Sequence, residues 1–187
     1  WSFFFACLSP LFLHTKEGEM SGVLVTVGTT KFEKLICEIE KKEFAEALHS
    51  LGYTAIHVQY GTGREPSLDH LLNLGIKTNK FSLKPSLRED FESSSLIISH
   101  AGAGSCLEAL GMKKKLLVVI NDQLMHNHQS ELAEELARNN YLIATNCSNF
   151  LSNLKSDALS QTDPFPSRDT SLFGGLMDEE MGLTSYS

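Results

Sequence analysis

The densest group of residues that could bind a charged ligand is the segment His100-Ala101-Gly102-Ala103-Gly104-Ser105. It follows a short apolar run, residues 96–99, and precedes a stretch with helical spacing. Small residues let backbone N–H groups approach a ligand closely, and the helix that follows offers its positive N-terminal end to an anion. We therefore expect an anionic group to bind here. The plainer alternative is a tight strand-to-helix turn that needs glycine only for its geometry.

Two well-known enzyme motifs fit this segment poorly. A dinucleotide-binding fingerprint requires a third small residue at the position of Leu107. A nucleophile elbow requires serine at the centre of Gly-x-Ser-x-Gly, and Ser105 is displaced from that position. Glu108, one turn into the helix, can accept hydrogen bonds from a ribose diol. The alternative explanation is that an acidic residue near the start of a helix stabilises the helix through its dipole. His100 is the one candidate for a general base in this group.

Two other segments carry polar groups suited to ligands. Gly28, Thr29 and Thr30 follow the apolar run 23–27 and place a glycine and two hydroxyls before an expected helix, as in turns that bind phosphate. The segment His126-Asn127-His128-Gln129, at the start of the expected helix 127–138, offers neutral donors and acceptors that suit sugar hydroxyls. Helix capping is the alternative explanation for both segments.

Apolar runs alternate with helical patterns along the chain. Strands are expected over residues 23–27, 55–60, 76–81, 96–99, 116–120 and 141–144. The main helices are expected over 32–51 and 127–138. Strands that are apolar throughout are typical of a parallel sheet covered on both faces, so the predicted fold is α/β, a doubly wound, mostly parallel, Rossmann-like sheet. The polar segments described above all lie at the carboxyl ends of strands, where such sheets bind ligands.

The composition excludes several kinds of partner. The formal net charge is −7, whereas a protein that binds a nucleic-acid backbone needs a cationic face, so no nucleic acid is expected. The cysteines have neither the spacing of metal ligands nor that of a disulfide framework, which fits a reducing compartment. We expect no metal and no cofactor. The four cysteines are Cys7, Cys37, Cys106 and Cys147.

We divide the chain into three parts. Residues 1–19 are partly apolar but lack the basic region and cleavage site of a signal peptide and are too short to span a bilayer, so we expect a non-native or disordered extension. Residues 20–163 form the predicted α/β domain. Residues 164–187 form a tail with an apolar helical stripe, which either packs on this domain or docks a partner. The stripe consists of Leu172, Phe173, Leu176 and Met177.

Three motifs, in this order, resemble the catalytic subunits of the eukaryotic dolichyl-diphosphate N-acetylglucosamine transferases. They are Val25–Phe32, Ile98–Glu108, and Val118–Asn121 together with Asn127–Gln129. The similarity extends over residues 23–183. The family in turn resembles the donor-binding C-terminal half of GT-B glycosyltransferases. The sequence departs from the family in its tail, where an acidic stretch replaces the family's basic C-terminal region.

The resemblance implies an inverting transfer of N-acetylglucosamine from UDP-N-acetylglucosamine to N-acetylglucosaminyl-diphosphodolichol, the second step of lipid-linked oligosaccharide synthesis for N-glycosylation. A membrane-anchored, acceptor-binding subunit would complete a heterodimer at the cytosolic face of the endoplasmic reticulum, and this chain would be inactive alone. The sequence has no Asp-x-Asp motif, which fits a metal-independent reaction. Two alternatives remain open: a non-catalytic UDP-sugar-binding regulatory paralogue, and a UDP-sugar epimerase or hydrolase on the same scaffold.

The resemblance also implies residue roles. The first three of the residues below would lie beside the diphosphate, and the next four would line the donor cleft. Glu108 would bind the ribose, and the last three residues would contact the sugar hydroxyls. The predicted substrate-binding residues are Gly28, Thr29, Thr30, Gly102, Ala103, Gly104, Ser105, Glu108, Asn127, His128 and Gln129.

Overall fold

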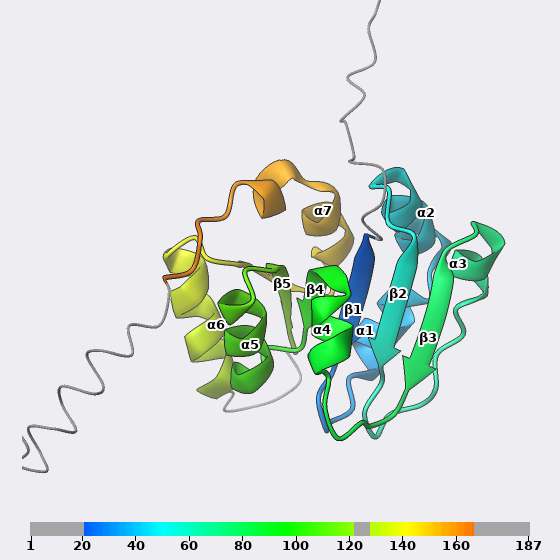
Figure 1. The fold of residues 1–187 in the computed structure, drawn as a ribbon, viewed down its shortest axis with the longest axis horizontal. Helices are drawn as coiled ribbons and strands as arrows, with labels where there is room; N and C mark the ends of the chain where they lie inside the picture. Colours follow the sequence, from blue (N-terminus) through cyan, green and yellow to red (C-terminus); the bar gives the residue numbers. More distant parts are fainter. Residues whose placement is uncertain (1–20, 122–127, 167–187) are drawn as a thin grey trace, which may run out of the picture.

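The computed structural model describes residues 21–121 and 128–166, and its core is a six-stranded sheet (Figure 1). The strands are β1 (Gly22–Thr26), β2 (Ala55–Gln59), β3 (Lys77–Phe81), β4 (Ser94–Ser99), β5 (Lys115–Ile120) and β6 (Ile143–Asn146). The helices are α1 (Glu33–Ile39), α2 (Lys42–Ser50), α3 (Asp69–Asn73), α4 (Arg88–Glu92), α5 (Ala103–Gly111), α6 (His128–Arg138) and α7 (Phe150–Lys155), followed by a 3₁₀ turn (Asp157–Ser160).

The order of the strands is β3-β2-β1-β4-β5-β6, and every neighbouring pair is parallel. The chain starts at the centre with β1, moves outward through β2 and β3, and returns to the other side of β1 with β4. This reversal confirms the predicted doubly wound α/β fold. It also creates a topological switch point between β1 and β4, the place where sheets of this kind bind their ligands.

Two apolar layers cover the sheet, one on each face. Val23, Ile56 and Ile98 belong to one layer, which packs against α1, α2 and α7. Leu24 and Ile97 point to the opposite face and pack against α4, α5 and α6. Figure 1 shows α4, α5 and α6 on the near face and α1 and α2 behind the sheet. Burial of both faces explains why β1, β4 and β5 read as largely apolar runs. The expectation that every strand is apolar throughout is wrong for β3, which is polar and mostly exposed at the edge of the sheet.

The predicted single helix over residues 32–51 is wrong, because the chain forms α1 and α2 separately. Lys41, between them, has an extended backbone with φ −69° and ψ 146°. The apolar positions step by five residues from Ile39 to Phe44, which does not fit one face of a continuous helix. A break lets both helices turn their apolar faces to the sheet. The short helix α3 was not predicted, and the last strand begins two residues later than expected.

Parts of the predicted organisation lie outside the described residues, namely the 1–19 extension and the apolar stripe of the tail. Within residues 21–121 and 128–166, no helix is long and apolar enough to cross a membrane.

The fold predicts a large stability loss for Phe150→Ala. The Phe150 ring is fully buried and stacks on Phe44, with 5.7 Å between ring centroids, so it joins α7 to α2. Truncation of a buried phenylalanine costs about 3–5 kcal/mol because it leaves a cavity. Leu72→Ala is the control, since this side chain is 54% exposed. Urea titration of both variants should show a change within about 0.5 kcal/mol for the control. Equal losses would contradict the packing described here.

Candidate functional site

The carboxyl ends of β1 and β4 meet around the imidazole of His100. A Cβ atom added to Gly28 or to Gly102 would lie 2.7 Å from Cε1 of this ring, too close for any real side chain. Gly28 also has a φ of +63°, a conformation that other residues rarely adopt. Both glycines are therefore required by the ring that lies between them, and they fix its place at the switch point.

Thr26 holds the His100 ring in place. Its carbonyl oxygen accepts a hydrogen bond from the backbone N–H of His100 (3.2 Å) and lies 3.3 Å from Nδ1 of the ring. Because a carbonyl can only accept, the proton of the neutral ring resides on Nδ1, and Nε2 carries the lone pair. Burial lowers the pKa of His100, against the opposing effect of the Thr26 hydrogen bond. A neutral imidazole with an accepting Nε2 can take a proton from a hydroxyl group.

The turn after β1 uses two of its donors for its own structure. The backbone N–H of Gly28 donates to Oγ1 of Thr26 (3.2 Å), and the Thr30 hydroxyl donates to the carbonyl of Val27 (2.9 Å). The Thr30 carbonyl accepts a hydrogen bond from the N–H of Thr62 (3.0 Å), which ties this turn to the loop after β2. Thr29 is exposed, and its hydroxyl makes no hydrogen bond among the described residues, so it is available to a ligand.

The turn after β4 is strained and then opens into a helix. Ala101 is buried and has a φ of 71°, in the left-handed region, which costs an alanine roughly 1–2 kcal/mol. Gly102 then caps α5 without any side-chain hydrogen bond to the first turn. This strained turn directs both the His100 ring and the N-terminus of α5 to the switch point.

Gly104, in the first turn of α5, is exposed, and a Cβ atom there would meet nothing within 4 Å. Packing within the chain therefore does not require a glycine at this position. Absence of a side chain leaves the backbone of the helix start open to a ligand.

The structure places the other predicted residues as follows. Ala103 and Glu108 are exposed on α5, and Ser105 is half-buried. His128 and Gln129 are the first two residues of α6, and Asn127 lies outside the described residues. Of the predicted site, the structure brings Gly28, His100 and Gly102 into contact. Among the described residues, no group of three His, Cys, Asp or Glu side chains gathers as a metal site would require.

The sequence analysis missed a second set of polar residues at this edge of the sheet. Thr26, Gln59 and Ser99 are the last residues of β1, β2 and β4, and all three are buried. A polar residue that directly follows apolar residues at the end of a strand is a detectable signal, because burial of a polar group costs free energy unless it is hydrogen-bonded.

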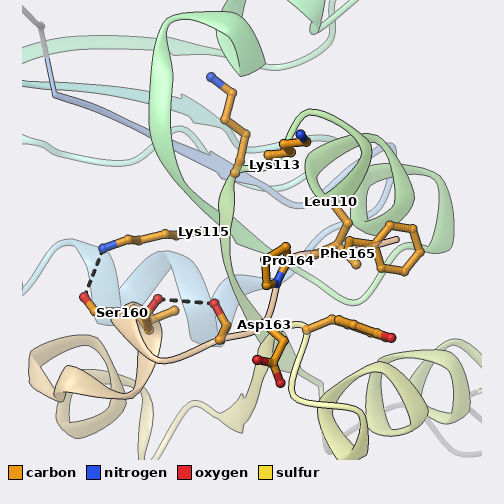
Figure 2. A pocket seen from close by; sticks show the side chains of 11 residues that line it. Leu110, Lys113, Lys115, Ser160, Asp163, Pro164 and Phe165 are labelled. Carbon is orange, nitrogen blue, oxygen red and sulfur yellow. Dashed lines mark hydrogen bonds between the residues drawn. The ribbon is translucent and has the colours of Figure 1, made fainter. Parts of the chain in front are cut away.

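Two hollows lie away from the switch point. Figure 2 shows the first, of about 290 Å³, where Lys115, the first residue of β5, faces the segment with Ser160, Pro164 and Phe165. It lies at the amino ends of the strands, and its Lys115 ammonium already donates to the Ser160 hydroxyl (3.0 Å). The second, of about 430 Å³, lies beside β6 and contains Asn146, among other residues. Neither contains the residues around His100.

Comparison with known proteins places this geometry in a family. Residues 22–168 match the family described as the glycosyltransferase family 28 C-terminal domain. The mouse (Mus musculus) UDP-N-acetylglucosamine transferase subunit ALG13 is 41% identical over 133 residues, which cover 68% of this chain and 11% of the mouse protein. The chain thus matches only a small part of the length of this relative.

Two solved structures share the fold. The NMR solution structure of ALG13 superposes with a TM-score of 0.62 at 24% identity and covers 84% of this chain and 94% of that chain. The crystal structure of Acinetobacter baumannii MurG superposes with a TM-score of 0.54 at 16% identity and covers 89% of this chain but 43% of MurG. The likeness to MurG is therefore to less than half of a longer chain. The family match covers most of the sequence, and the chain belongs to the glycosyltransferase family 28 C-terminal domain family.

Proposed function

We propose that this chain is the donor-binding subunit of an enzyme that transfers N-acetylglucosamine from UDP-N-acetylglucosamine to N-acetylglucosaminyl-diphosphodolichol. A membrane-anchored subunit supplies the acceptor site at the cytosolic face of the endoplasmic reticulum. The observation that carries the proposal is the contact of Gly28, His100 and Gly102 at the β1–β4 switch point. Membership of a glycosyltransferase family and the name of the mouse relative support the donor and the role as one subunit of a transferase. The acceptor follows from the resemblance of the three sequence motifs to the dolichyl-diphosphate N-acetylglucosamine transferases.

The chemical task of this site is to stabilise a leaving group. Transfer with inversion at the anomeric carbon breaks the bond to UDP and leaves negative charge on the diphosphate. The N-terminus of α5, beyond Gly102, and the exposed Thr29 supply donors and a favourable dipole for that charge without a metal ion. The open backbone at Gly104 lets a phosphate approach closely.

The remaining roles follow from the sequence resemblance. Glu108 accepts hydrogen bonds from the ribose diol, and Asn127, His128 and Gln129 contact the sugar hydroxyls. Nε2 of His100 accepts a proton or a hydrogen bond from a hydroxyl group, which makes His100 the catalytic candidate within this chain. The acceptor side of the cleft comes from the partner subunit, as expected for one half of a GT-B enzyme.

The first test of this function is reconstitution. The purified chain should bind UDP-N-acetylglucosamine but transfer no radiolabelled sugar to the lipid acceptor. Membranes from cells depleted of their own donor subunit should transfer sugar only after the chain is added. Efficient transfer by the chain alone would contradict the half-enzyme interpretation, and binding of UDP-N-acetylglucosamine without restored transfer would favour a regulatory paralogue.

The open backbone at Gly104 predicts opposite effects of Gly104→Ala on stability and on binding. Alanine should leave the fold as stable or stabilise it by roughly 0.5–1 kcal/mol, because glycine is the poorer helix former. Its methyl group should obstruct the diphosphate and weaken UDP binding at least tenfold, or about 1.4 kcal/mol. Gly111→Ala is the matched control, since a Cβ atom at Gly111, at the other end of α5, also meets nothing within 4 Å.

Calorimetry with UDP and thermal unfolding of both variants measure the two effects. Unchanged UDP affinity in Gly104→Ala, or the same loss in Gly111→Ala, would remove the diphosphate from the start of α5.

The proposed role of Glu108 predicts a loss of ribose recognition. Loss of a hydrogen bond to a charged group costs about 1.5–3 kcal/mol, so Glu108→Ala should weaken UDP binding by roughly tenfold or more. The variant should also bind UDP and 2′-deoxy-UDP with similar affinity, whereas the unaltered protein should prefer UDP. Glu89→Ala, which removes an exposed carboxylate from α4, should change neither value. Retention of the preference for UDP in Glu108→Ala would exclude this contact.

A further inference from the structure

The buried hydroxyl of Thr26, on β1, forms hydrogen bonds both with β2 and with the turn after β1. It donates to Oε1 of Gln59 on β2 (2.5 Å) and accepts a hydrogen bond from the backbone N–H of Gly28 (3.2 Å). A hydroxyl has one proton, so donation to Gln59 turns a lone pair towards Gly28. The Gln59 carboxamide thereby sets the direction in which Thr26 accepts.

The same threonine also contacts the turn after β4. Its carbonyl oxygen accepts from the backbone N–H of His100 and lies within hydrogen-bond reach of Nδ1. One residue of β1 thus connects β2 on one side with the turn after β4 on the other. Both turns of the candidate site depend on the position of Thr26.

Burial of Gln59 is difficult to explain by packing alone. Gln59 is 4% exposed and lies on the face of the sheet that carries Leu24 and Ile97, which are fully buried and apolar. An apolar side chain would fill this position without the cost of burying a carboxamide. Oε1 of Gln59 is a fixed acceptor for Thr26, which an apolar residue does not provide.

We infer that Gln59 is a positioning residue, which acts through the Thr26 hydroxyl to hold the Gly28 amide and the turn that meets the diphosphate. The inference deepens the proposed function and rests on it for the identity of the ligand. Without the Gln59 acceptor, the Thr26 hydroxyl is free to rotate. Its lone pair then faces the Gly28 N–H in only some of the orientations that the hydroxyl adopts. The turn then populates several conformations, and a phosphate that requires one of them binds less tightly.

Three substitutions separate positioning from stability. Thr26→Val keeps the shape of the side chain and removes the hydroxyl, whereas Thr26→Ser keeps the hydroxyl. Gln59→Met keeps the length of the side chain and removes the carbonyl acceptor. Thr26→Val and Gln59→Met should each weaken UDP binding about tenfold. Both should leave the affinity for uridine, which lacks phosphates, nearly unchanged. Thr26→Ser should behave as the unaltered protein for both ligands.

The double variant tests whether the two residues act as one unit. The double variant of Thr26→Val and Gln59→Met should bind UDP with about the affinity of whichever single variant binds UDP less tightly. The reason is that both changes break the same chain of hydrogen bonds. Equal losses for UDP and uridine, additive losses in the double variant, or a loss in Thr26→Ser as large as in Thr26→Val would overturn the inference.

Amide hydrogen exchange tests the hydrogen-bond chain without any ligand. Protection of the Gly28 amide should fall about tenfold in Thr26→Val and in Gln59→Met and persist in Thr26→Ser. Unchanged protection of Gly28 in Gln59→Met would refute the positioning role even if the variant unfolds more easily. If the unaltered protein fails to bind UDP, the proposed function fails, whereas the exchange result still decides whether Gln59 positions the turn.

Discussion

The fit of the His100 imidazole between two glycines is the constraint on which the ligand edge of this protein depends. The ring leaves no room for a Cβ atom at Gly28 or at Gly102, and its Nδ1 faces the carbonyl of Thr26. The His100 ring therefore packs against both the turn after β1 and the turn after β4. A change in either turn moves the ring, and a displaced ring opens the contact between them. Ala101, in the strained left-handed conformation, lies directly between His100 and Gly102 in the chain.

This constraint has a chemical consequence. A half-buried imidazole whose proton is on Nδ1 is a neutral acceptor, and it leaves the stabilisation of negative charge to backbone groups and the dipole of α5. Such donors are fixed in place before a ligand arrives, so they do not need to reorganise as charge develops on a leaving diphosphate. The chain supplies this surface on one α/β domain. In the proposed function, the acceptor surface that a sugar transfer also needs comes from the partner subunit.

Much of this arrangement can be predicted from the sequence, because apolar runs are local signals of strands. Parallel sheets bind their ligands at the carboxyl ends of these strands, so the residues that follow each run are candidates for the site. The run 116–120 predicted β5 to within one residue, and the positions of Gly28 and His100 after strands predicted that they would lie at one edge. The break at Lys41 was missed, although the five-residue step from Ile39 to Phe44 is a local signal that one continuous helix does not fit. The partnership of Thr26 with Gln59 could not be predicted, since it requires knowledge that β2 lies beside β1. Gly28 was expected beside a diphosphate, but its own N–H donates inward to Thr26.

The central claim is that the diphosphate of the donor binds beside His100 at the β1–β4 switch point. Long-range proton–nitrogen NMR of the histidine rings, with His100→Asn used for assignment, tests it most directly. In the free protein the spectrum should show a neutral His100 ring with its proton on Nδ1. Addition of UDP should shift the His100 ring and the Thr29 and Gly104 amides, while uridine should have a much smaller effect. A bound UDP that leaves these signals unchanged would contradict the account.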